Sequence, residues 1–215
     1  MLSQGDRSGD ASLFDNVREY IRKVYQKPGN VYLALLHRLD RPVGGLIIFA
    51  KTGKAAGRMG KLFKEQQVNK SYLAVVDGPP PNTGYQEHYL KKISPKNVVK
   101  VSDRPFEDAQ QAKQNFEVLK RTRKFSLLRV EPMTGKPHQI RALLSFEGYP
   151  IVGDQKYGSK APVSDYSIAL FSSCISFCHP VKRERMVFRQ APPHSYPWNL
   201  FPKRTYLKEN PGKGS

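Results

Sequence analysis

The residue with the clearest chemical potential in this chain of 215 residues is Asp40, which stands between two arginines. It belongs to the stretch HRLDRP at positions 37–42, and apolar runs at 31–36 and 45–50 flank that stretch. Two strand-like runs around a Pro-containing hinge predict that Asp40 lies at the end of a sheet strand, where reactive groups often occur. A structural role stays open, because an aspartate in such a stretch also caps turns or pairs with a neighbouring arginine.

Other familiar catalytic patterns are missing from the sequence. It has no glycine-rich phosphate loop, no serine nucleophile motif and no group of residues with metal-ligand spacing. The histidines His37, His138 and His179 lie far apart in the chain, and a lone histidine is more often structural. Carboxylate, arginine and tyrosine remain, so we expect chemistry without a metal or an organic cofactor.

The charge balance indicates a polyanionic partner. Lysine and arginine number 36 against 18 acidic residues, which gives a formal net charge of +18. So many positive side chains repel one another in a compact fold unless a polyanion binds, and nucleic acid is the commonest polyanion. The alternative is a basic surface that only maintains solubility.

The sequence carries no sign of a membrane or secreted protein. No apolar run approaches the roughly 18 residues of a membrane helix, and the first residues lack the features of a signal peptide. Cys174 and Cys178 on one expected strand would lie about 13 Å apart, too far for a disulfide. We therefore expect reduced core cysteines in a cytoplasmic, monomeric protein without metal or membrane partners.

Hydrophobic periodicity predicts two helices near Asp40. Ser12 caps an expected helix over residues 13–24, and Thr52 caps a second helix that follows the 45–50 run. The second helix has an apolar face and a cationic face, and the cationic face either is simply solvated or contacts phosphates. The cationic face consists of Lys54, Arg58, Lys61 and Lys64.

Strands outnumber helices in the rest of the chain. Residues 82–113 are polar, with short strand candidates near 88–93 and 97–101, and predict a flexible hairpin insert that reaches toward a partner. The pattern favours an α+β fold with a mixed, mainly antiparallel sheet flanked by helices, forming a single domain over 1–207 with a disordered basic tail over 208–215. Strands are expected near 70–76, 115–120, 125–131, 167–170, 174–178 and 186–189, and a short helix at 138–147.

Three blocks, in the same order and with similar separations, resemble the signature segments of the RluA-type pseudouridine synthases. They are HRLDRPVGGLIIFAK at 37–51, KSYLAVV at 70–76 and TGKPHQIR at 134–141, the last followed by PIVGDQKYG at 150–158. The resemblance implies a pseudouridine synthase-like catalytic domain that isomerises a uridine in structured RNA, either rRNA or tRNA, without a cofactor.

The resemblance also implies roles for three residues in the reaction. Asp40 would be the nucleophile that detaches uracil from C1′, a task that suits a carboxylate beside a sugar. Arg141 would pair with Asp40 and aim it. Tyr72 would stack on the uracil and move a proton at C2′ or C5.

Further residues are expected to contact RNA. Arg38 matches a family arginine that fills the gap left by the flipped base, because a base inside a helix must leave the stack before it can react. Lys136 stands where the family more usually has arginine, and it would contact RNA together with His138. Arg58 and Lys61 are expected to meet phosphates.

Two features depart from the family pattern. Residues 43–45 read Val-Gly-Gly where the family usually has Thr-Ser-Gly. The family also has two strands ahead of the segment that resembles residues 4–6, so the N-terminal edge of the sheet is expected to be truncated. Two other functions stay open: an RNA-binding or ribosome-assembly factor whose activity has decayed, and a glycosidase that acts on small nucleosides.

Overall fold

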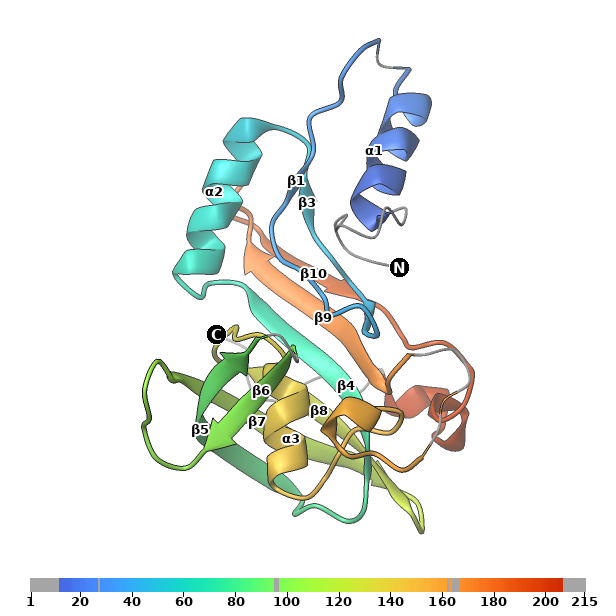
Figure 1. The fold of residues 1–215 in the computed structure, drawn as a ribbon. Coiled ribbons are helices and arrows are strands. Elements are labelled where there is room, and N and C mark those ends of the chain that lie inside the picture. Colours follow the sequence, from blue (N-terminus) through green and yellow to red (C-terminus); the bar gives the residue numbers. More distant parts are fainter. Residues whose placement is uncertain (1–11, 27, 95–96, 162, 164–166, 207–215) are drawn as a thin grey trace.

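The computed structural model describes residues 12–26, 28–94, 97–161, 163 and 167–206, and Figure 1 shows their arrangement. Helices flank a twisted central sheet, and α3 lies across the strands β7 and β8 in this view. All strand pairs of the central sheet but one are antiparallel within the described residues. The predicted α+β fold with a mixed, mainly antiparallel sheet is therefore confirmed.

The helices α1 (Leu13–Val24) and α2 (Gly53–Lys64) begin where the sequence predicts their caps. The Ser12 side chain accepts the backbone N–H of Asp15 at 3.2 Å, and Thr52 accepts the N–H of Ala55 at the same distance. Each cap satisfies one of the N–H groups that a helix start leaves without an intrahelical partner.

Eight strands of the described chain form one sheet. Seven follow the order β10-β9-β4-β8-β7-β5-β6, and β2 pairs with β9 in parallel. A separate two-stranded ladder joins β1 to β3. The strands are β1 (Ala34–Leu35), β2 (Gly44–Gly45), β3 (Phe49–Ala50), β4 (Asn69–Asp77), β5 (Thr83–Ile93), β6 (Val98–Ser102), β7 (Gln110–Arg121), β8 (Phe125–Pro132), β9 (Leu170–Cys178) and β10 (Arg185–Arg189).

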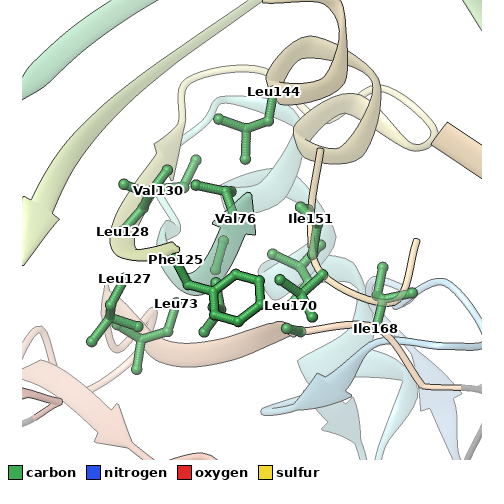
Figure 2. Packing of buried hydrophobic residues seen from close by; sticks show 14 of the residues in the cluster. Leu73, Val76, Phe125, Leu127, Leu128, Val130, Leu144, Ile151, Ile168 and Leu170 are labelled. Carbon is green, nitrogen blue, oxygen red and sulfur yellow. The ribbon is translucent and has the colours of Figure 1, made fainter. Parts of the chain in front are cut away.

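The main hydrophobic core lies around the middle strands of this sheet. Figure 2 shows Leu144 of α3 (Gln139–Phe146) directed toward Val76 of β4 and Val130 of β8. Trp198 and Phe201 belong to the same cluster and cover it from the C-terminal segment. Three short 3-10 helices complete the described fold: η1 (Gln155–Tyr157), η2 (Trp198–Leu200) and η3 (Lys203–Thr205).

The two apolar runs around Asp40 form less strand than the sequence predicts. Ala34–Leu35 and Phe49–Ala50 pair with each other outside the main sheet, and Gly45 alone of these two runs pairs with β9. Asp40 therefore lies in the loop between β1 and β2, and not at the end of a strand of the central sheet as predicted. The polar hinge is held by a turn, in which the Val43 N–H donates to the Asp40 carbonyl at 2.9 Å.

Within the described residues of 82–113, β5 and β6 pair as a hairpin, as predicted, but they belong to the central sheet together with the start of β7, so the prediction of a flexible insert is wrong. The sequence shows only parts of these strands because their buried positions include amide side chains. Gln86 and Gln114 are almost fully buried, and the Gln114 amide donates to Gln86 at 2.6 Å. The Gln86 amide in turn donates to the Leu143 carbonyl at 3.4 Å. Buried amides of this kind remove the apolar alternation by which strands are recognised.

The C-terminal part of the sheet differs in detail from the prediction. The strand expected at 174–178 is the second half of β9, which begins at Leu170, whereas residues 167–169 of the strand expected at 167–170 form no strand. Cys174 is half-buried, but Cys178 is exposed at the end of β9, so the expectation of two core cysteines is wrong for Cys178. The tail predicted at 208–215 lies outside the described residues. No helix in the described ranges is long and apolar enough to cross a membrane.

The loop that carries Asp40 is fixed to β9. The Pro42 carbonyl accepts the N–H of Ile168 at 3.1 Å, and the N–H of Leu46 donates to the Ser172 carbonyl at 2.9 Å. Gly45 has a φ of +116°, and a Cβ at this position would collide with the backbone of Ser172. Only glycine fits this conformation and this close approach, which explains the glycine at position 45.

Candidate active site

Arg141 joins two carboxylates at the centre of the site. Its Nε and Nη2 donate to the two oxygens of Asp154 at 2.7 and 2.9 Å, and its Nη1 donates to Oδ2 of Asp40 at 3.1 Å. The first turn of α3 supplies Arg141, and the residue before η1 supplies Asp154. The predicted pairing of Asp40 with Arg141 is present, and Asp154 is a partner that the sequence analysis did not assign.

Burial makes this arrangement sensitive to charge. The side chains of Arg141 and Asp154 are 6% and 1% exposed, whereas Asp40 is 29% exposed. Burial alone lowers the pKa of Arg141, but the hydrogen bonds and charge of Asp154, and then those of Asp40, outweigh it and raise that pKa above its ordinary value. Asp154 thus fixes a permanent cation behind Asp40, and only Asp40 opens toward solvent.

His138 lies beside the same carboxylate. It precedes α3 in a left-handed conformation with φ of 51°, and its Nε2 is 3.9 Å from Oδ2 of Asp40. Its Nδ1 is 2.8 Å from the hydroxyl of Tyr157, which also accepts the N–H of Val99 at 3.0 Å. Burial lowers the pKa of His138, although the charge of Asp40 opposes that effect. His138 is therefore neutral at pH 7.

Tyr72 belongs to the same site. It lies on β4 opposite Ser172 of β9, next to a register shift between Ser71 and Tyr72. Burial raises the pKa of the Tyr72 phenol to about 12; the neighbouring Ser172 hydroxyl opposes the rise and the charge of Asp40 adds to it. The phenol keeps its proton at neutral pH, so it suits stacking or hydrogen-bond donation better than proton abstraction.

His37 fastens the start of the Asp40 loop. Its Nε2 accepts the N–H of Ile48 at 3.1 Å, and its ring stacks on Phe63 of α2 with centroids 5.2 Å apart. Burial, with a contribution from Lys70, lowers the pKa of His37 to about 4. A neutral His37 thus links α2 to the loop that carries Asp40.

Comparison with known proteins identifies the family. A family model described as RNA pseudouridylate synthase matches residues 1–146. The chain belongs to this family. Within it, the structure of human RNA pseudouridylate synthase domain containing 4 aligns with a TM-score of 0.76 at 23% identity, over 93% of this chain and 85% of that one. The expected pseudouridine synthase-like fold is therefore confirmed.

Curated members of the family show the same similarity in sequence. Ribosomal large subunit pseudouridine synthase C of Buchnera aphidicola subsp. Baizongia pistaciae is 35% identical over 179 residues, which is 77% of this chain and 55% of that protein. The tRNA pseudouridine synthase C of Haemophilus influenzae is 32% identical over 169 residues, 70% of each. Against three of the curated relatives, the chain spans 55%, 40% and 60% of their length.

The residues expected to contact RNA occupy different places around this family site. Arg38 is exposed in the Asp40 loop, and Arg58 and Lys61 are exposed on α2, which His37 links to that loop. Lys61 lies 3.7 Å from Glu65, so part of its charge is neutralised. Lys136 is half-buried and donates to Gln110 at 2.8 Å, which ties it to β7.

A groove of about 580 Å³ lies apart from Asp40. Leu73 and Arg129 are cross-strand partners that line it, whereas the neighbouring Tyr72 points to the other sheet face. Asp40, Tyr72 and Arg141 are not among the lining residues. The groove is therefore not part of the candidate site.

The site has two members that sequence reasoning missed, Asp154 and Tyr157. Both lie in the PIVGDQKYG segment, whose resemblance to the family was the available signal. Among the described residues, no three His, Cys, Asp or Glu side chains gather as they would around a metal ion. The expectation of a metal-free reaction stays a prediction.

The buried partner of Arg141 leads to a stability prediction. Asp154→Asn should lower the free energy of unfolding by about 3–5 kcal/mol, because it leaves a buried cation without its main counter-charge. Chemical denaturation measures the change. Asp108→Asn is the matched control, since the exposed Asp108–Lys91 pair should contribute less than about 1 kcal/mol. Equal effects of the two variants would contradict the role given to Asp154.

The buried His37 leads to a pH prediction. The unfolded chain takes up a proton at this residue below pH 6.5, whereas the folded chain does so only near pH 4. Its stabilising contribution is therefore complete above pH 6.5 and declines by about 3 kcal/mol as the pH falls to 4. His37→Gln can still accept the Ile48 N–H without titrating, so unfolding free energies of this variant should fall less over that range. Identical pH profiles would refute the assignment.

Proposed function

We propose that this chain is an RNA pseudouridine synthase that isomerises a uridine in structured RNA. The observation that carries the proposal is the partly exposed Asp40 carboxylate, which Arg141 holds by one oxygen while Asp154 fixes Arg141. Cleavage of an N-glycosidic bond needs such an oriented carboxylate near the sugar. Family membership supports the same reaction.

The proposed reaction uses the two oxygens of Asp40 differently. Oδ2 accepts Arg141, and Oδ1 has no hydrogen-bond partner within the described residues. Oδ1 would form a bond to C1′ while the C1′–N1 bond breaks and its electron pair moves to the uracil. After the uracil turns, C5 would displace Asp40 from C1′, C5 would lose its proton, and N1 would gain one. Uracil and sugar thus exchange one bond for another without an oxidant or a cofactor.

Tyr72 and Arg38 would stabilise the flipped state of the base. Tyr72 would stack on the uracil, and its protonated phenol favours hydrogen-bond donation over removal of a proton. Arg38, two residues before Asp40 and exposed, would occupy the space that the flipped nucleotide leaves. The target would be rRNA or tRNA, since the relatives include a ribosomal large subunit pseudouridine synthase and a tRNA pseudouridine synthase.

The rival function is an RNA-binding or assembly factor that has lost activity. A protein without activity would not need a buried Arg141 between two acidic side chains. Here Asp40, Arg141 and Asp154 are all present and in contact. Pseudouridine maps of cellular RNA with and without the gene would separate the two functions and identify the target.

Asp40→Asn should abolish pseudouridine formation, by about 10⁴-fold or more, because an amide cannot replace the attacking carboxylate. Single-turnover reactions with rRNA and tRNA, read by pseudouridine-specific chemical mapping, measure the rate. RNA affinity should stay within about twofold, since Asp40 contributes no positive charge to phosphate binding. Asp108→Asn is the control and should react at the normal rate. Activity retained in Asp40→Asn would rule out this mechanism.

The cationic face of α2 leads to a separate prediction for RNA binding. Arg58→Ala with Lys61→Ala should weaken binding of every RNA alike and reduce the slope of log K against log salt by about 1–2. Lys61 should contribute the smaller part because of its pair with Glu65. Lys120→Ala at the end of β7, together with Arg123→Ala on the β7–β8 turn, removes the same charge and is the control. An unchanged slope for the α2 variant would mean that this helix faces away from RNA.

A further inference from the structure

The hydrogen bonds around Tyr157 determine which nitrogen of His138 carries the proton. The Tyr157 oxygen accepts the N–H of Val99 at 3.0 Å and lies 2.8 Å from Nδ1 of His138. If Nδ1 carried the proton, the phenol proton would have no acceptor among the described residues. Donation from Tyr157 to a bare Nδ1 satisfies every group in this cluster. The neutral His138 is therefore protonated on Nε2.

This tautomer directs an N–H group at the carboxylate of Asp40. Nε2 is 3.9 Å from Oδ2, the same oxygen that accepts Arg141 at 3.1 Å. The distance is too long for a hydrogen bond, but a movement of about 1 Å would make one. His138 is only 9% exposed in its side chain, so it has little surface to offer to RNA directly. Its nearest polar neighbours are Asp40 and Tyr157.

We propose that Tyr157 and His138 form a positioning pair for Asp40, an inference that rests on the proposed function. Tyr157 would fix the imidazole tautomer, and the Nε2–H would close onto Oδ2 when RNA binds. Two donors on Oδ2 would then prevent rotation of the carboxylate and present Oδ1 to C1′. His138 thereby acts through Asp40, and the RNA contact expected from the sequence is not its main task.

Two substitutions of His138 separate this role from a structural one. The amide nitrogen of Gln in His138→Gln lies near the place of Nε2, whereas that of Asn in His138→Asn lies near Nδ1. His138→Gln should keep kcat within a few-fold, and His138→Asn should lose on the order of 10²-fold with RNA affinity unchanged. If residue 138 served only to maintain the left-handed backbone, His138→Asn would be the more active of the two variants. Asn tolerates this conformation better than Gln. Equal rates, or a better Asn variant, would overturn the proposal.

A double-mutant cycle tests whether Tyr157 acts through His138. Tyr157→Phe should lower kcat about 10-fold in the natural background and have no further effect beside His138→Asn. Additive losses would show that Tyr157 works independently and would overturn the pairing. Thermal unfolding of all variants, measured alongside, separates a loss of fold from a loss of positioning.

A measurement without catalysis keeps this proposal distinct from the proposed function. The ¹⁵N resonances of the His138 ring distinguish a protonated from a bare nitrogen, and they should report Nε2–H in the natural protein and a mixture in Tyr157→Phe. An Nδ1–H tautomer in the natural protein would overturn the positioning pair whatever the activity. An inactive natural protein with the Nε2–H tautomer would instead refute the function and retain the hydrogen-bond assignment.

Discussion

The geometry of one guanidinium determines the candidate site. Arg141 presents a rigid planar fork, and Asp154 occupies two of its N–H groups from inside the protein. The remaining donor direction leads to Asp40. A lysine in this place would supply the charge without the direction, because an ammonium rotates freely and cannot engage two carboxylates in a fixed plane. Since both acids are needed to balance and orient the buried cation, the three residues act as one unit.

The strand β9 gives this unit its place in the fold. It pairs with β4, which carries Tyr72, and with β2, which ends the loop that carries Asp40. Where β2 and β9 pair, the backbone of Ser172 leaves no room for a side chain at Gly45. The loop is thus held by backbone contacts, and backbone contacts vary less with sequence than side-chain packing does. A short parallel pairing of two residues is enough, because the hydrogen bonds at Ile168 and Leu46 extend it on both sides.

Sequence reasoning predicts the parts of this molecule in which local chemistry decides the structure. Ser12 and Thr52 correctly predict the starts of their helices, because a capping side chain and an apolar stripe are both short-range features of the sequence. The pairing of Asp40 with Arg141 follows from the resemblance to the family. It would not follow from spacing, since 101 positions separate the two residues.

The remaining features depend on contacts that no short segment encodes. The first halves of β5 and β7 escape prediction because Gln86 and Gln114 occupy buried positions there, where Gln114 donates to Gln86. The runs on each side of Asp40 look like strands of one sheet, but apart from Gly45, which pairs with β9, their paired residues join one another outside the main sheet. Asp154 looks like an ordinary loop acid next to a glycine until Arg141 is seen beside it. In each case the partner lies outside the segment that carries the pattern, so the pattern around the residue carries little information about it.

The attachment of the Asp40 loop to β9 also bears on the order in which the molecule is made. Asp40 leaves the ribosome about 130 residues before Ile168 and Ser172, which hold its loop. Closing so long a stretch of chain carries a large entropic cost until β4 and β8 have formed a template for β9. A nascent chain therefore exposes its basic helix α2 long before the Asp40 carboxylate is in position. Under the proposed function, RNA binding by α2 and isomerisation at Asp40 would become possible at different moments of synthesis, and the last strand pairing would separate them.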